Sequence, residues 1–281
     1  MEVLSMPPPS AGGTLLIQGL RILEDLERRA DVLTEAERTS LTASVLESIL
    51  EERPDFGDPD FVSVATNEML SDSLVQRMAE RISSGIGSER GSTPVGAGST
   101  SHFCVVDRAG NAVSATETIE CYFGSGVVLP GLGITMNDEM HDFETTPGRP
   151  NSVAPHKRPA SSMTPTIVLD DGSPSMVIGG AGSQRIISSI FQVMTNVLDR
   201  RMSLADALVA PRLHPSDEGL MLEGGFDAAV VPELKRLFGR IRPRGKLDLF
   251  FGGVQAIVVD QGKKTTMGCA DPRRLGAAVS A

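Results

Sequence analysis

A run rich in glycine and serine divides the chain into two unlike parts. It covers residues 83–99 (SSGIGSERGSTPVGAGS), contains a proline and has no hydrophobic periodicity. Such a run predicts a flexible linker or an exposed loop. Before it, apolar residues recur at helical spacing, and after it most periodic segments alternate as strands do. We therefore expect residues 1–99 to be a helical segment that ends in a linker, and residues 100–281 to be a second, strand-rich segment.

The first segment is expected to hold three helices. Leucines spaced as on one helical face predict the first over residues 14–29. Thr34 and Glu37 form the pattern of a capping box, and the helix that they begin must stop before Pro54. A third stripe of apolar residues predicts a helix over residues 73–82.

The second segment groups its strands and helices instead of alternating them. A hairpin is expected over residues 102–119 and a second strand pair over residues 162–178. Further helices are predicted over residues 183–198, 204–209 and 228–238, followed by a strand over residues 254–259. Grouping of this kind favours an α+β fold with antiparallel sheets over a doubly wound parallel sheet.

Composition excludes several classes of partner. The net charge of −10 disfavours electrostatic binding to nucleic acid or to an anionic membrane, and the lack of tryptophan removes stacking platforms for single strands. Three widely spaced cysteines exclude a disulfide scaffold and a CxxC zinc site. The first residues carry no signal-peptide pattern and no apolar run could span a bilayer, so this chain alone predicts a cytoplasmic location with no membrane partner.

A threonine at the junction of linker and strand is the first candidate for chemistry. If the peptide bond before Thr100 were cut, the new α-amine could act as a base for the hydroxyl of the same residue. The residue pattern alone leaves this open, because a Gly-Ser-Thr sequence is common in linkers that have no other role.

Three further segments each allow two interpretations. The bend at residues 179–183 either offers backbone N–H groups to an oxyanion or is a tight turn. Residues 137–143 (NDEMHDF) are a metal site, a pocket for a substrate ammonium or a solvated acidic loop, and they match no zinc signature. Ser161 and Ser162 either bind a carboxylate or simply open a strand. Cys104 and Cys121 lie in strand-like segments, where packing is the expected role.

Taken together and in this order, the segments resemble the γ-glutamyltransferase family of N-terminal nucleophile (Ntn) amidohydrolases. The resemblance covers essentially the whole chain and is carried by SMPPPSAGG, GDPDFVSV, TSHFCVVDRAGNAVSATETI, FGSGVV, NDEMHDF, HKRPASSMTPTIV, GGAGSQRI, APRLH and ADPRR. It implies a four-layer αββα sandwich with antiparallel sheets. It also implies that the sandwich is incomplete on its N-terminal side, because family precursors carry a long part before the PPPS segment.

The resemblance implies a role for each site residue. Thr100 would be the nucleophile, released when the precursor cuts itself after Ser99, and Thr118 would orient it. Ser161 and Ser162 would bind the substrate α-carboxylate, and Glu139 and Asp142 would bind its α-ammonium. The backbone N–H groups of Gly182 and Ser183 would form the oxyanion hole. A γ-glutamyl amide would be cleaved and its acyl group passed to water or to an amino acid, with no metal and no cofactor.

The chain departs from the family pattern at several positions. Glu120 stands where the family usually has an asparagine that binds the substrate ammonium, and this added carboxylate raises neighbouring pKa values or suits a more cationic ligand. Ser183 stands where a second glycine is typical, and the short segment at residues 151–155 predicts an open site. The arginine that clamps the substrate carboxylate in the family belongs to the part that is absent here, and no residue was matched to it.

Three hypotheses follow. The first is a γ-glutamyl acyltransferase or hydrolase, acting on glutathione or another γ-glutamyl amide and completed by a separately encoded N-terminal half. The second is the same scaffold with an altered substrate in specialised metabolism, which Glu120 favours. The third is not an enzyme but a truncated, non-catalytic fragment or a pseudoenzyme that acts as a binding partner. The cytoplasmic location is expected from this chain alone. Members of the family that it resembles are commonly exported.

Overall fold

A five-stranded antiparallel sheet forms the centre of the molecule. The computed structural model describes residues 1–30, 32–85 and 98–280. The predicted linker at residues 83–99 therefore lies mostly outside the described residues. The sheet has the order β1-β4-β5-β9-β10, with strands β1 (Glu2–Ser5), β4 (Thr166–Asp170), β5 (Ser173–Ala181), β9 (Gly253–Asp260) and β10 (Thr265–Ala270).

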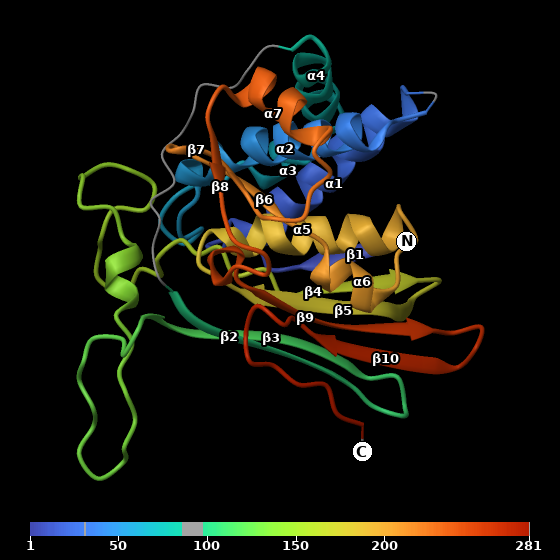
Figure 1. Cartoon of the computed structure of the whole chain (residues 1–281). Helices are drawn as coiled ribbons and strands as arrows, with labels where there is room; N and C mark the ends of the chain where they lie inside the picture. Colours follow the sequence, from blue (N-terminus) through green and yellow to red (C-terminus); the bar gives the residue numbers. More distant parts are fainter. Residues whose placement is uncertain (31, 86–97, 281) are drawn as a thin grey trace.

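Helices cover one face of this sheet (Figure 1). Their bounds are α1 (Gly12–Arg28), α2 (Glu35–Leu50), α3 (Thr66–Met69), α4 (Asp72–Ser83), α5 (Arg185–Leu198), α6 (Leu204–Val209) and α7 (Val230–Phe238). The predicted capping box begins α2: Glu37 N donates to Thr34 Oγ1 at 3.2 Å, and Thr34 N donates to Glu37 Oε2 at 2.8 Å. No helix in the described part of the chain is both long and apolar enough to cross a membrane.

Short elements complete the helical side. A small sheet contains β6 (Leu213–Ser216), β7 (Gly219–Leu222) and β8 (Ile241–Pro243), and single 3-10 turns occur at Arg53–Asp55, Glu139–Asp142 and Leu249–Phe251. One hydrophobic core joins the helices to the central sheet. Its fully buried members include Leu15, Ile49, Phe191 and Val254.

A hairpin packs against the opposite face of the sheet (Figure 1). Its strands are β2 (Gly98–Val106) and β3 (Ala112–Cys121), and Ser114 Oγ donates to Ile178 O of β5 at 2.9 Å. A Cβ at Gly179 would lie 2.2 Å from the His102 ring, so only glycine allows the two sheets to approach this closely. The described residues thus form three layers, helix, sheet and sheet, and the outer face of the hairpin has no helical layer over it in this part of the chain.

Candidate active site

Thr100 and Thr118 face each other across the hairpin. They are direct partners in the antiparallel register of β2 and β3, and Thr100 is buried. The Thr100 hydroxyl donates a hydrogen bond to Thr118 Oγ1 at 3.1 Å. The strand pairing therefore fixes the contact between the proposed nucleophile and the residue expected to orient it.

The peptide bond before Thr100 is also held by Thr118. The register shifts between Gly98 and Thr100, so Ser99 lies in a β-bulge, a device common beside active sites. Thr118 Oγ1 donates to Ser99 O at 3.3 Å and accepts from Glu120 N at 2.9 Å. One hydroxyl thus binds both the Thr100 hydroxyl and the carbonyl oxygen of the bond expected to break.

Three carboxylates form an acidic pocket at the end of β3. Oxygen atoms of Glu120, Glu139 and Asp142 lie within 4.8 Å of one another. Burial, followed by the neighbouring carboxylates, raises the pKa of Glu139 to about 7. The pKa values of Glu120 and Asp142 are raised as well, with burial as the main cause. In the described part of the chain, Glu139 Oε1 is shielded from solvent and accepts no hydrogen bond. The pocket is therefore suited to a cationic group.

Backbone geometry turns Glu120 into this pocket. Its φ of 67° lies in the left-handed region, which costs a residue with a Cβ roughly 1 kcal/mol or more. Asn151 holds the loop that supplies the other two carboxylates. Its side chain donates to Asp142 O at 2.7 Å and accepts from Ala160 N at 2.8 Å. These bonds tie the acidic loop to the segment that leads to Ser161.

Arg53 lies beside the acidic pocket, and sequence reasoning missed it. Its Nε donates to Ser162 Oγ at 2.8 Å, and its charge interacts with Asp142 and Glu120. Burial lowers the pKa of Arg53, while these carboxylates oppose that effect. The only local signal was its place just before the GDPDFVSV segment, which does not reveal a contact with a serine 109 residues later.

The two serines are placed differently from each other. Ser162 is buried and shares its hydroxyl with Arg53, which connects it to the acidic pocket. Ser161 accepts a hydrogen bond from Met163 N at its Oγ (3.1 Å) and another from Ala11 N at its carbonyl (2.9 Å). Ser161 therefore joins this segment to the start of α1 as well as presenting a hydroxyl.

The bend between β5 and α5 contains Gly182 and Ser183. Their φ values are 150° and 55°, and a Cβ at Gly182 would lie 2.9 Å from Gly252 Cα. Neither N–H donates a hydrogen bond to any residue that the structure describes. Ala181, just before the bend, lines a cavity of about 560 Å³ together with Thr100. The bend thus begins at the cavity that Thr100 also lines.

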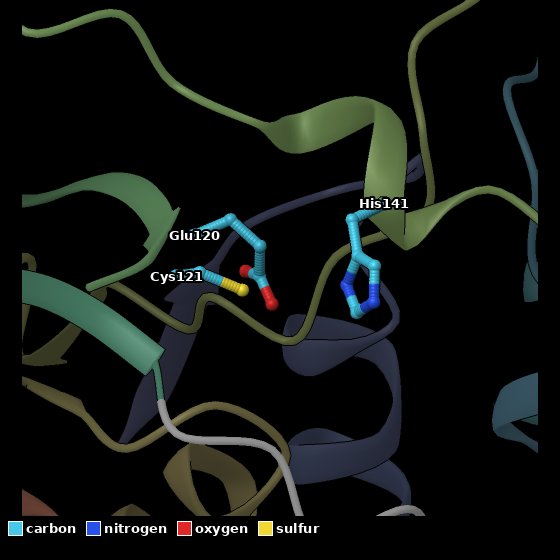
Figure 2. Close-up of side chains that lie close together, drawn as sticks. All are labelled: Glu120, Cys121 and His141. Carbon is cyan, nitrogen blue, oxygen red and sulfur yellow. The ribbon is translucent and has the colours of Figure 1, made fainter. Parts of the chain in front are cut away.

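The side chains of Cys104 and His102, both on β2, are packed groups. Burial raises the pKa of Cys104 to about 12 and lowers that of His102 to about 4. With these pKa values both groups are uncharged near neutral pH, in keeping with the packing role expected for Cys104. Cys121 is half-buried at the end of β3 and lies beside Glu120 and His141 (Figure 2).

Comparison with known proteins gives consistent results. The family model for gamma-glutamyltranspeptidase matches residues 1–281. The glutathione hydrolase proenzyme of Escherichia coli is 33% identical over 98% of this chain and 50% of its own length. The acylase ACY 1 proenzyme of a Pseudomonas species is 33% identical over 83% of this chain and 42% of its own length.

A solved structure extends the comparison to the fold. The chain is similar to a gamma-glutamyltranspeptidase mutant from Pseudomonas nitroreducens, with 38% identity, a TM-score of 0.58 and coverage of 64% of this chain and 98% of that one. The antiparallel, layered fold expected from the sequence is thereby confirmed as that of Ntn hydrolases. The chain spans about half the length of the curated relatives that it matches. It belongs to the gamma-glutamyltranspeptidase family.

Proposed function

We propose that this chain is the catalytic C-terminal half of a γ-glutamyl acyltransferase or hydrolase. The observation that carries the proposal is the contact of Thr118 with both the Thr100 hydroxyl and the Ser99 carbonyl oxygen. Thr100 would attack that carbonyl carbon and form an ester, with Thr118 donating its hydrogen bond to the oxygen that gains charge. Ester formation breaks the C–N bond between Ser99 and Thr100 and so frees the Thr100 α-amine. Hydrolysis of the ester then releases the Thr100 hydroxyl and leaves Ser99 as a free carboxylate, and the α-amine serves as the base for the hydroxyl of its own residue.

The groups in and beside the acidic pocket suit a γ-glutamyl substrate. The acidic pocket would bind its α-ammonium, and Ser161, Ser162 and Arg53 would bind its α-carboxylate. The free N–H groups of Gly182 and Ser183 would stabilise the oxyanion formed when Thr100 attacks the γ-amide. Water or an amino acid then releases the acyl group. No step in this sequence uses a metal or a cofactor.

We propose a separately encoded N-terminal half as the partner. Residues 1–99 and 100–281 would then be the end of a large-subunit-like segment and the small catalytic segment. The outer face of the hairpin carries Phe103, Val105 and Val113, each about half exposed, where a second helical layer of the sandwich would pack. The segment between β3 and the turn Glu139–Asp142 projects from the body of the molecule, and it also exposes apolar side chains (Figure 1). The shortfall in length against relatives fits a partner of about the same size.

Turnover of a γ-glutamyl anilide tests this proposal. The chain is purified alone and together with the product of a neighbouring gene that encodes the complementary half. We expect anilide cleavage by the complex, and faster product release when an acceptor amino acid is added. A complex that is cut at Thr100 but cleaves no γ-glutamyl compound would refute the γ-glutamyl assignment while leaving the nucleophile in place.

An acylase with an altered substrate is the second candidate, and Glu120 is the observation that favours it. The Glu120 carboxylate stands where the family usually has an asparagine amide, and it makes the charge of the acidic pocket more negative. The similarity to an acylase proenzyme is in keeping with this candidate. If it holds, Glu120→Asn increases γ-glutamyl anilide turnover at the expense of the natural substrate. An unchanged rate in Glu120→Asn would argue for the first candidate.

Substrate affinity is expected to depend on pH through Glu139. Its pKa is raised to about 7, so its carboxyl group becomes charged only as the pH rises through that value. An α-ammonium binds the charged form, and KM should therefore fall as the pH rises from about 6 to 8. Glu139→Gln should flatten this part of the KM profile. Glu117 is exposed and lies on the same face of the hairpin as Ser101, so Glu117→Gln is the control. This variant should keep the pH dependence of KM. An unaltered profile in Glu139→Gln would assign the titration to another group.

Arg53 is expected to contribute mainly to substrate binding. Arg53→Ala removes the charge-assisted hydrogen bond that Arg53, held beside Ser162, would donate to the substrate α-carboxylate. Such a bond is worth about 1.5–3 kcal/mol, so KM should rise about 10- to 100-fold. Arg53→Lys keeps the charge and should recover part of this loss. Arg149→Ala, which breaks an exposed ion pair with Glu144, is the matched control. A drop in kcat with no change in KM would contradict a binding role.

A further inference from the structure

We propose that Glu120, Cys121 and His141 form a binding site for a borderline-soft divalent ion such as Zn²⁺ at the rim of the acidic pocket. A carboxylate oxygen, the thiol sulfur and a ring nitrogen of these residues all lie within 4.8 Å of one another. Figure 2 shows the Glu120 and Cys121 side chains directed into the space that faces the His141 ring. The ligands come from two separate segments, the end of β3 and the turn Glu139–Asp142.

The three donor types match what zinc requires. Zinc binds thiolate, imidazole and carboxylate at about 2.0–2.3 Å, and sites with three protein ligands keep a fourth position open. Ligand atoms around one tetrahedral ion are about 3.3–3.8 Å apart at those bond lengths, so the cluster must close by about 1.5 Å at most. His141 is exposed and can make this movement by a rotamer change. Thiolate and imidazole ligands disfavour Mg²⁺ and Ca²⁺.

The charges around the cluster also favour a cation. Asp138 accepts a hydrogen bond from Cys121 N at 3.0 Å, and carboxylate oxygens of Glu139 and Asp142 lie within 4.8 Å of one of Glu120. The shielded Glu139 Oε1, which accepts no hydrogen bond from the described residues, adds negative potential. Zinc binds the thiolate form of a cysteine, so an ion bound here would take the place of the Cys121 proton.

The site would have a regulatory consequence that rests on the proposed function. Glu120 belongs both to this cluster and to the pocket proposed for the substrate α-ammonium. The Glu120 carboxylate cannot bind the metal ion and the substrate α-ammonium fully at the same time, so the ion and a γ-glutamyl substrate should compete. Binding of the ion itself does not depend on turnover, and the two claims can fail separately.

Titration of the full chain with Co²⁺ under reducing conditions tests the site. Cobalt bound to a thiolate gives an intense near-ultraviolet charge-transfer band, and we expect it to saturate at one equivalent and to disappear when Zn²⁺ is added. Cys121→Ser should abolish the band, and His141→Gln should weaken binding at least about tenfold. Cys269→Ser on β10 is the matched thiol control and should bind as the parent does.

Several results would overturn the site. One is a band that survives in Cys121→Ser, and another is the lack of saturable uptake by the parent chain. Binding that persists in both Cys121→Ser and His141→Gln but is lost in Asp142→Asn would place the ion on the three carboxylates instead. His141 is exposed, so His141→Gln is a valid test even if Cys121→Ser proves unstable.

Discussion

Thr100→Ala is expected to remain a single uncut chain in the presence of its complementary half, whereas Thr100→Ser is cut at the same bond. The hydroxyl is the attacking group, and serine retains it, although without the methyl group that helps to hold the threonine rotamer. γ-Glutamyl turnover by Thr100→Ala should fall on the order of 10⁶-fold, the scale seen when a hydrolase loses its hydroxyl nucleophile. Intact mass and anilide cleavage measure the two effects.

A neighbouring hydroxyl provides the control for this prediction. Ser101 is exposed and, one position along β2, points to the opposite face of the hairpin. Ser101→Ala should be cut as the parent is. Thr118→Val should slow the cut because it removes both hydrogen bonds at the bond expected to break. Cleavage of Thr100→Ala after Ser99, or loss of cleavage in Ser101→Ala, would contradict the assignment of Thr100.

Asp271→Asn is expected to give the largest loss of stability. Asp271 bonds to Arg212 at 2.6 Å and to Arg273 at 3.2 Å, and Arg273 also pairs with Glu223 at 2.5 Å. All four side chains are buried. Removing one charge leaves buried arginine charge uncompensated, which costs about 3–5 kcal/mol in the free energy of unfolding. For a chain of this size Tm should fall by roughly 6–10 °C.

A partly exposed aspartate is the matched control for Asp271. Asp260 pairs with Lys263 on the surface, and Asp260→Asn should change the free energy of unfolding by no more than about 1 kcal/mol. Equal effects of the two substitutions would contradict the structural role of the buried cluster. The cluster also bears on the site, because it anchors the segment in which Arg274 donates to Thr100 O at 3.2 Å.

Elements with strong local patterns were predicted well. Helix α6 begins at Leu204 and ends at Val209 as expected, because Ser203 caps it and its apolar residues are clear. The hairpin was also predicted, although β2 begins four residues earlier, at Gly98. Helix α5 begins at Arg185 and not at Ser183, since the backbone of Ser183 is left-handed and cannot start a helix.

Short strands with distant partners could not be predicted. Strand β1 has four residues and pairs with β4, more than 160 positions away along the chain. Four residues are too few to show a period of two, and nothing local indicates the partner. The strands of the small sheet were missed for the same reason, as was β10, whose residues show little alternation in burial.

The site was predicted in part. The acidic loop and Glu120 were named from the sequence, and the structure brings their carboxylates together. The pairing of Thr100 with Thr118 follows from the hairpin register, which a sequence pattern suggests but does not fix. Arg53 and the role of Asn151 depend on side chains that bridge separate loops, and such contacts leave no trace in local sequence.

Trapping the acyl-enzyme tests the central proposal most directly. The complex is mixed with a γ-glutamyl anilide, quenched in acid within its first turnover, digested and mapped by mass spectrometry. We predict one glutamyl group, held as an ester on the hydroxyl of a peptide that begins with Thr100 as its free N-terminus. Turnover accompanied by an adduct on another residue, or by a peptide in which Ser99 is still joined to Thr100, would contradict the proposal.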